Sequence, residues 1–424
     1  MFRKAQTDGI YIFSKQHLHL YMRKQAICTV FILVAVFLQS CNNHSYASSA
    51  DNAKVIRINF DQTPECIHTI GLIDSLKIIS LNTPYDNIII GEIDKVVRFD
   101  DKLYLLDIRQ TRSVFIFNTN GDFINVISNF GQGPGEYLQL NDIFINRADS
   151  TLNLLCRIGQ RLFVYDLTGK NLLRIEAMPK PFSRITRMKN GYAADMGNWR
   201  ANRQLPYSLW LLCDTLSIVS YHVRINPLFE SRGIGGMQHF SYFQDHTYFI
   251  ALFDYNVYSI SNTGEVEVKY RFDLGALTLT ERRLRRYSRG NTDLLVLLNR
   301  YRTIEKFQET QNHLITQVLH RGQFLLGIYN KNTEQVRIAE LTSYIGRYWF
   351  SFGRIVSFDE NTIYSLLDAE RVRRIWLGED EWGNNFAETH PEQVRNLQER
   401  FAYIDEEDNP HIFAAAKDTK KLEE

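Results

Sequence analysis

The chain has 424 residues, of which 44% are hydrophobic and 13% aromatic, and its 49 Lys and Arg nearly balance its 48 Asp and Glu. This composition excludes an extended disordered chain, and the balanced charge gives no electrostatic footprint for nucleic acid. The length allows two or three domains, or a single closed array of repeats.

Residues 1–40 predict a secretion signal that takes no part in the fold. Arg23 and Lys24 precede an apolar run at 26–38, which is shorter than the roughly 20 residues that a membrane-spanning helix requires. Met22 stands directly before these two basic residues and is a better start for such a signal than Met1.

The end of the apolar run, Leu38-Gln39-Ser40-Cys41, resembles the lipobox of bacterial lipoproteins. That resemblance implies that Cys41 is acylated and becomes the first residue of the mature chain, which would carry a small acidic excess. The polar residues that follow predict a flexible tether at 41–53. We therefore expect a lipid anchor in the cell envelope at the outer membrane, and the sequence does not assign the domain to the periplasmic or the surface-exposed side.

A repeated nine-residue pattern organises the rest of the chain. Val114–Asp122 has apolar residues in alternation followed by a polar turn with Gly, and Leu162–Lys170 and Val257–Glu265 repeat it. Each copy predicts an antiparallel hairpin, and recurrence at a near-constant interval is typical of a propeller or another repeat array. The Gly of the pattern is lost in the third and fifth repeats, so the blade boundaries there are less defined.

The repeats predict an all-β fold, a six-bladed β-propeller of four-stranded antiparallel blades over 54–416. Six blades closed by both chain ends is the simplest count. In such a ring, leading strands at 55–60 and 76–81 would pair with the last blade and cover its edge. The expected blades span 91–127, 141–177, 184–223, 239–272, 304–341 and 352–377.

Two helices and two terminal features accompany these blades. Apolar residues at helical spacing predict a helical insertion at 277–302 and a C-terminal helix at 391–403. The segment His411–Ala414 predicts an edge strand, and 417–424 is a polar tail.

Several local motifs are similar to those of a known family. They are the loop Phe130–Tyr137, the strand Leu103–Asp107 and the Phe-x-Phe-Asn hairpin at 115–118. The chain resembles the six-bladed β-propeller lipoproteins of Bacteroides-type bacteria, which are related to NHL-repeat propellers. This resemblance implies architecture more than activity.

Candidate ligand-binding residues lie in the turns, loops and insertion that connect the expected strands. An arginine-rich run at 282–289 could bind a carboxylate or phosphate, although a solvated helix face is the more ordinary interpretation. Carboxylates at the blade turns Asp107, Asp142 and Asp254 could form a pair at one mouth of the channel, but their separation cannot be read from sequence. The residues expected to contact a ligand are Glu136, Tyr137, Asp142, Trp199, His239, Arg282 and Arg285.

The sequence shows no catalytic motif, no metal-ligand spacing and no cofactor signature. Buried thiols are the ordinary interpretation of Cys156 and Cys213, and a disulfide between them is the alternative. We therefore expect a lipid-anchored binding or interaction module whose ligand, a glycan or a partner protein of the envelope, sits at the mouth of the central channel. The alternative is a carbohydrate-active hydrolase or lyase with its site at the same mouth.

Overall fold

The computed structural model describes residues 52–66, 72, 75–84, 88–198, 205–227, 239–280, 282–284, 300–320, 323–340, 342–345, 348–351, 355–359, 361–367 and 411–416. All of them belong to the compact unit Ala47–Glu424. Cys41, Trp199, Arg285, the expected helix at 391–403 and the tail at 417–424 lie outside the described residues.

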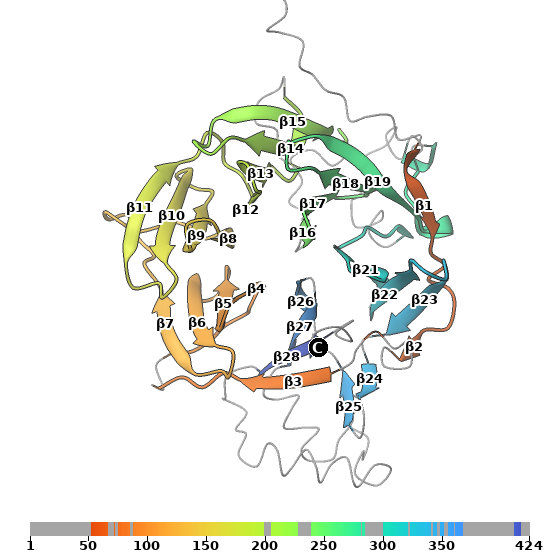
Figure 1. Cartoon of the computed structure of the whole chain (residues 1–424), viewed down its shortest axis with the longest axis horizontal. Helices are drawn as coiled ribbons and strands as arrows, with labels where there is room; N and C mark the ends of the chain where they lie inside the picture. Colours follow the sequence, from red (N-terminus) through yellow and green to blue (C-terminus); the bar gives the residue numbers. More distant parts are fainter. Residues whose placement is uncertain are drawn as a thin grey trace, which may run out of the picture. The chain divides into compact units, whose positions relative to one another are not determined.

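Five antiparallel sheets each contain four consecutive strands, with the first strand innermost, and these are called blades 1 to 5 (Figure 1). Blade 1 is β4 (Lys95–Phe99), β5 (Lys102–Asp107), β6 (Ser113–Asn118) and β7 (Phe123–Ile127), and blade 2 is β8 (Asp142–Asn146), β9 (Thr151–Cys156), β10 (Arg161–Asp166) and β11 (Leu172–Ala177). Blade 3 is β12 (Arg184–Arg187), β13 (Tyr192–Asp195), β14 (Tyr207–Leu212) and β15 (Ile218–Arg224). Blade 4 is β16 (Phe240–Phe243), β17 (His246–Ala251), β18 (Asp254–Ile260) and β19 (Val266–Asp273), and blade 5 is β20 (Lys306–Glu309), β21 (His313–His320), β22 (Gln323–Asn330) and β23 (Val336–Glu340).

A further four-stranded sheet is assembled from distant parts of the chain, and we call it the composite sheet. Its order is β26 (Ile355–Phe358), β27 (Thr362–Leu367), β28 (His411–Ala416) and β3 (Ser75–Ser80). The expectation of six equivalent blades is therefore corrected, because only five blades consist of consecutive strands. The segment that begins at His411 is not an edge strand, since β28 is hydrogen-bonded to β27 on one side and to β3 on the other.

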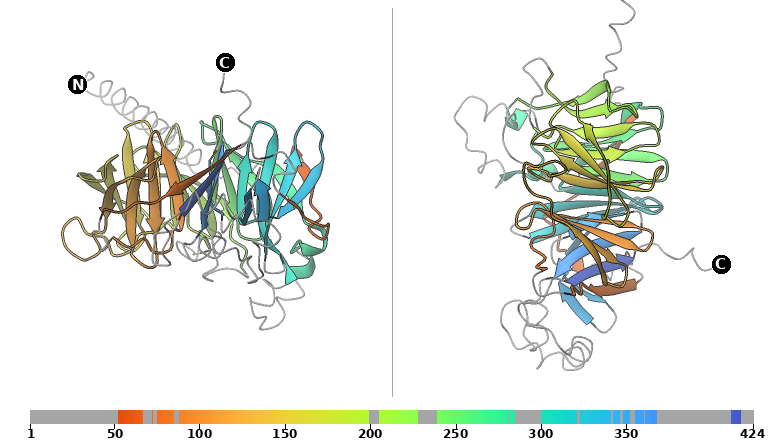
Figure 2. Two further views of the ribbon diagram at one scale, coloured as in Figure 1. Left: turned by 90° about the horizontal axis from the view of Figure 1, so that it is seen from below. Right: turned by 90° about the vertical axis from the view of Figure 1, so that its left-hand side faces the viewer.

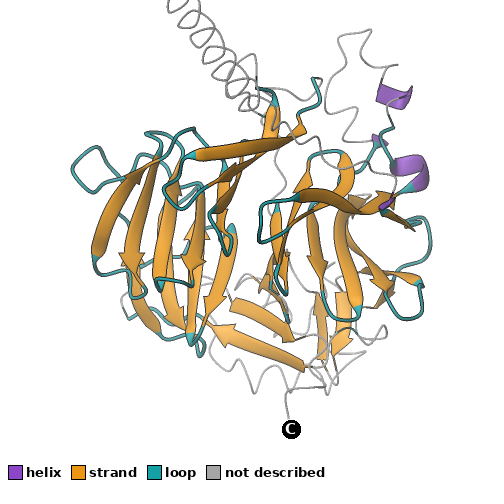
Figure 3. Ribbon diagram, turned by 45° about the horizontal axis from the view of Figure 1, so that its top comes forward, coloured by secondary structure: helices purple, strands orange, loops and turns teal. Residues whose placement is uncertain are grey.

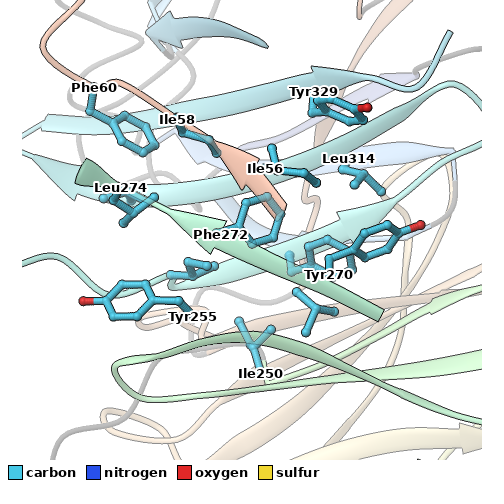
Figure 4. Close-up of a cluster of buried hydrophobic side chains, with 14 of the residues drawn as sticks. Ile56, Ile58, Phe60, Ile250, Tyr255, Tyr270, Phe272, Leu274, Leu314 and Tyr329 are labelled. Atoms are coloured by element: carbon cyan, nitrogen blue, oxygen red, sulfur yellow. The ribbon is translucent and has the colours of Figure 1, made fainter. Parts of the chain in front are cut away.

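The amino-terminal strands do not all join the last sheet, which corrects a second expectation. Strand β1 (Lys54–Arg57) pairs in parallel with β19 of blade 4, and β2 (Glu65–Cys66) pairs in parallel with β23 of blade 5. Figure 4 shows why β1 settles there: Ile56 and Ile58 insert into the buried cluster that also contains Phe272. Removal of this apolar surface from water favours the pairing over an exposed edge.

The described residues contain little helix. Of the expected insertion at 277–302, residues 277–280, 282–284 and 300–302 are described. They include the end of a 3-10 helix at Gly275–Leu277 and a helical turn at 282–284, and Figure 3 shows helix in purple. A two-stranded hairpin, β24 (Thr342–Ile345) and β25 (Tyr348–Ser351), follows blade 5. Within the described part of the chain, no helix has the length and apolar character needed to cross a membrane.

The repeated sequence pattern forms the turn between the third and fourth strands of a blade. In blade 1 the Asn118 side chain accepts hydrogen bonds from the backbone N–H groups of Asn120 and Asp122, and Gly121 has a φ of 95°. Asp166 and Ser261 accept equivalent bonds in blades 2 and 4, again with Gly in the positive-φ position. Gly is favoured at this position because an L-residue is strained at such a φ.

The third blade keeps this turn without glycine, with Leu216 in the positive-φ position at a φ of 61°. In the fifth blade the bond that closes the turn spans one residue more, from the Glu334 N–H to the Asn330 carbonyl, and Glu334 has a φ of 58°. The backbone N–H of Leu216 donates to the Cys213 carbonyl, as that of Gly121 does to Asn118. The turn of the third blade is therefore preserved where the sequence signature is lost.

Hydrogen bonds join the inner strands of neighbouring sheets all the way round the ring seen in Figure 1. In five of these joints an inner strand supplies the side chain. The sixth joins Asp195, at the end of β13, to His239, which directly precedes the inner strand β16. From blade 1 onward the joints are Lys95 with Asp142, Asp142 with the Ile185 N–H, Asp195 with His239, Gln308 with the Tyr242 carbonyl, Lys306 with the Val356 carbonyl, and Ser357 with the Val96 N–H. The composite sheet is thus joined to both of its neighbours, blades 5 and 1.

Candidate functional site

The two faces of the ring differ in the length of their connections. The strands of each blade alternate in direction, so successive connections lie at opposite faces of the ring. We call one of them the first face. It receives the connection from the second to the third strand of each blade and the connection from each blade to the next inner strand. The turns from first to second and from third to fourth strands reach the other, the second face, and the edge-on views of Figure 2 show both. Every connection on the second face within blades 1 to 5 has five residues or fewer, whereas 128–141, 196–206 and 225–239 on the first face have eleven or more.

His239 and Asp195 form a buried pair at the first face. Asp195 is the last residue of β13, and His239 immediately precedes the inner strand β16, so two neighbouring blades supply them. The His239 Nδ1 is hydrogen-bonded to Asp195 Oδ2, and the Gly197 N–H donates to the other carboxylate oxygen at 2.7 Å. A carboxylate on Nδ1 fixes the orientation of the ring and leaves Nε2 for another partner.

Arg184 and Arg157 lie near Asp195. Arg184 stands opposite Asp195 in the register of β12 and β13, and its Nη1 donates to the Asn141 carbonyl at 2.5 Å. Burial lowers the pKa of Arg157, and the negative charge of Asp195 works against that shift. The arginines and His239 give this part of the first face groups suited to ligand carboxylates or hydroxyls.

The loop before blade 2 uses its candidate residues internally. The Glu136 carboxylate accepts a hydrogen bond from the Gly133 N–H at 2.7 Å and packs against Gly131. Tyr137 is buried, donates to the Arg112 carbonyl at 2.8 Å, and meets Phe163 edge to face. Both residues therefore shape the interblade loop in this structure.

The three blade-turn carboxylates are each held by separate contacts. Asp142 is paired with Lys95 at 2.7 Å, and Asp107 accepts the backbone N–H groups of Gln110 and Thr111. Asp254 accepts the Tyr258 hydroxyl at 2.5 Å, and burial raises the pKa of Asp254. In the described part of the chain, no cluster of three His, Cys, Asp or Glu could hold a metal ion.

The remaining candidates are dispersed. Arg282 is exposed on the helical turn after blade 4, and Trp199 and Arg285 lie outside the described residues. Cys156 and Cys213 are both free, and the Cys156 Sγ donates to the Ile158 carbonyl. Of the residues expected from sequence to bind a ligand, His239 is the one that the structure brings together with a buried carboxylate. Asp195 itself was missed, because a single Asp at the end of a strand carries no motif.

Comparisons with known proteins agree with this architecture. A family model described as "Domain of unknown function (DUF4934)" matches residues 53–415. A crystal structure from Bacteroides fragilis NCTC 9343, described as a "Putative exported protein", is 16% identical with a TM-score of 0.66, and the match covers 85% of this chain and 98% of that one. A member of the duf4221 family from Bacteroides vulgatus ATCC 8482 is 10% identical over 82% of this chain and 97% of that one, with a TM-score of 0.46. No curated protein matches the sequence.

Proposed function

The chain belongs to the family described as "Domain of unknown function (DUF4934)", and we propose that this member is a lipid-anchored binding module of the cell envelope. Its ligand, a glycan or a partner protein, would dock on the first face around His239. The observation that carries the proposal is that the strand ends joined by the long connections lie at that face of the propeller, because binding residues occur disproportionately on such loops.

The proposed location in the envelope rests on two observations. The Leu38-Gln39-Ser40-Cys41 segment resembles a lipobox, and the structural neighbour from Bacteroides fragilis is described as exported. We place the module at the outer membrane with Cys41 as the lipid attachment site. Incorporation of a radiolabelled fatty acid into the protein, and its loss in the Cys41→Ala variant, would support the anchor; equal labelling of both proteins would refute it.

The ring proposed here has six positions, of which the composite sheet takes the sixth. Support comes from its four strands and from its joints to blades 5 and 1 through Lys306 and Ser357. Because both chain ends contribute to this sheet, unfolding of either end would open the ring.

A matched pair of histidine variants tests the binding face. His239→Asn keeps a side-chain N–H donor for Asp195 but removes Nε2, while His246→Asn changes a partly exposed histidine at the second-face turn of the same blade. Glycan arrays and envelope pull-downs would first identify a ligand. We expect His239→Asn to weaken its binding about tenfold or more, as for loss of one hydrogen bond in a desolvated site. Full affinity in His239→Asn, or an equal loss in His246→Asn, would move the site away from His239.

A carbohydrate-active hydrolase or lyase is the second candidate, and the His239 and Asp195 pair is the observation that favours it. An imidazole oriented by a buried carboxylate can accept or donate a proton at Nε2. Glycan turnover that is lost in His239→Asn would support this candidate, and binding without turnover would favour the binding module.

A further inference from the structure

A second group of charged side chains lies where blades 4 and 5 meet toward the second face, away from His239. Glu309 is the last residue of β20, Lys269 lies in β19, and Lys331 directly follows β22. Together with Tyr248 and Tyr270 these residues form the Glu309 cluster. The signature repeats did not point to it, because its members come from separate strands.

Two ammonium groups share one buried carboxylate in the Glu309 cluster. Lys331 Nζ lies 2.9 Å from Glu309 Oε1, and Lys269 Nζ lies 3.2 Å from Oε2. The Tyr270 hydroxyl also donates to Oε1 at 3.0 Å. The carboxylate is therefore well supplied with donors.

The Glu309 carboxylate is stabilised in its ionised form by the groups around it. Burial would raise the pKa of Glu309, but hydrogen bonds from Lys331 and Tyr248 and the charges of both lysines lower it overall. Burial, with the nearby Glu309 charge, raises the pKa of Tyr248 and Tyr270, so both phenols stay neutral. Two ammonium groups thus contact one carboxylate, whereas an ordinary ion-pair joint needs one of each, and the exposed Glu267 adds a negative charge that acts on Tyr248.

The lysines also keep unused hydrogen-bond donors. Each ammonium carries three N–H groups. The Lys269 ammonium group donates hydrogen bonds to the Tyr248 hydroxyl and the Glu309 carboxylate, and the Lys331 ammonium group donates one to the Glu309 carboxylate. The two side chains retain 31% and 24% exposure, so the donors that remain can be reached from solvent.

Aromatic rings form the apolar side of the same cluster. Lys331 Nζ lies 4.8 Å from the centre of the Phe243 ring, and Lys269 Nζ lies 5.0 Å from that of Tyr248. Rings displace water beside the ammonium groups, and electrostatic attraction is stronger where water is excluded. The Asn312 carbonyl accepts the Lys331 backbone N–H, which fixes the turn that carries this lysine.

We propose that the Glu309 cluster is a binding site for an oxyanion, such as the carboxylate or sulfate group of an acidic glycan or inorganic phosphate, held by Lys269 and Lys331. The second ammonium group, the unused donors and the partial exposure distinguish it from a joint that only fastens two blades. The site is separate from the proposed ligand face. The His239→Asn variant should therefore respond to anions as the unmodified protein does, so that failure of one proposal is distinguishable from failure of the other.

The test measures thermal unfolding of the full chain in sodium sulfate, sodium phosphate and sodium chloride at equal ionic strength. A ligand that binds only the native state stabilises it by RT ln(1 + [L]/Kd), so the unfolding temperature rises with the logarithm of ligand concentration once this exceeds Kd. Sulfate and phosphate also stabilise folded proteins generally, by exclusion from the surface. We therefore expect a rise above the value in chloride that begins at low anion concentration, and we expect Lys331→Met to weaken the apparent affinity about tenfold while the general salt effect remains. Lys102→Met is the matched control, because Lys102 has a similar exposure of 21% and an Asp101 partner at 2.6 Å on the second face of blade 1.

Glu309→Gln should change the affinity for sulfate in the opposite direction to Lys331→Met. It therefore distinguishes an anion-binding site from an ion pair that only joins two blades. Removal of the competing carboxylate should destabilise the protein in chloride yet increase its affinity for sulfate, so that sulfate restores part of the lost stability. If sulfate and phosphate act as chloride does on the unmodified protein, or if Lys102→Met changes the response as much as Lys331→Met, the site does not exist. Should Glu309→Gln fail to fold, the two lysine variants decide the question alone.

Titration calorimetry distinguishes the source of the anion. Oligogalacturonate that binds more tightly than inorganic phosphate, with the difference lost in Lys331→Met, would identify a glycan carboxylate. Equal or stronger binding of phosphate would identify the free anion. Binding of neither probe would overturn the proposal.

Discussion

The Gly121→Ala substitution probes the contact between the composite sheet and blade 1. A Cβ on Gly121 would lie 1.9 Å from the backbone carbonyl oxygen of Ser80, which ends β3. The adjacent Asn82 N–H donates to the Gly121 carbonyl at 2.9 Å. Neither backbone can turn aside as a flexible side chain could, so the turn must move away from β3.

The expected loss of stability has separable parts. A φ of 95° costs an L-residue about 1–2 kcal/mol. Displacement of the packed turn adds about 1–3 kcal/mol, and loss of the hydrogen bond from Asn82 adds about 0.5–1.5 kcal/mol. We expect Gly121→Ala to destabilise the protein by about 2.5–6.5 kcal/mol in all.

Gly159→Ala isolates the backbone part of this loss. Gly159 has a φ of 93°, and a Cβ there would meet nothing within 4 Å. Its expected cost is therefore only about 1–2 kcal/mol. Equilibrium denaturation of both variants measures the difference, and equal losses for the two would show that β3 does not pack on blade 1 as described.

Three further outcomes are expected from single substitutions. Lys95→Met removes the cation from buried Asp142 and should cost about 1–3 kcal/mol in denaturation experiments, whereas the exposed-pair control Lys102→Met should change stability by less than about 1 kcal/mol. Tyr137→Phe deprives the Arg112 carbonyl of its donor and should cost about 1–2 kcal/mol by the same assay; no loss would mean that the hydroxyl bond is not formed. The pKa of the Glu309 carboxyl is lowered from 4.5 in the folded protein, so its contribution to stability is complete above pH 4.5 and is lost as the pH falls through the lower folded value. The free energy of unfolding of Glu309→Gln should therefore vary less with pH in this acidic range than that of the unmodified protein. Parallel pH profiles for the two proteins would contradict the ionised state assigned to Glu309.

The all-β propeller could be predicted because its turns carry local chemistry. Asn118, Asp166 and Ser261 each bond to their own turn, and the Gly that follows allows a positive φ, so a short stretch of sequence holds the whole signal. Leu216 and Glu334 adopt the same conformation without that signal. In blade 5 the Asn330 side chain still accepts the N–H groups of Asn332 and Thr333, so the local signal that these two turns lack is the glycine.

Long-range pairing explains the parts that sequence reasoning missed. Strand β1 was expected in the last sheet but packs in parallel on β19, because the pocket for Ile56 and Ile58 is built by blades 4 and 5. The partner of His239 could not be identified for the same reason, since Asp195 lies 44 residues away on another blade. Apolar alternation predicts that a strand exists, and it does not specify which edge the strand joins.

The most direct test of the closed ring is hydrogen exchange at the backbone amides of His411–Ala416. In this account β28 is an interior strand, hydrogen-bonded to β27 and to β3 from the other end of the chain. We expect these amides to be protected to nearly the same degree as those of β10 within blade 2. Rapid exchange across β28, as in an unpaired segment, would contradict closure of the ring by the two chain ends.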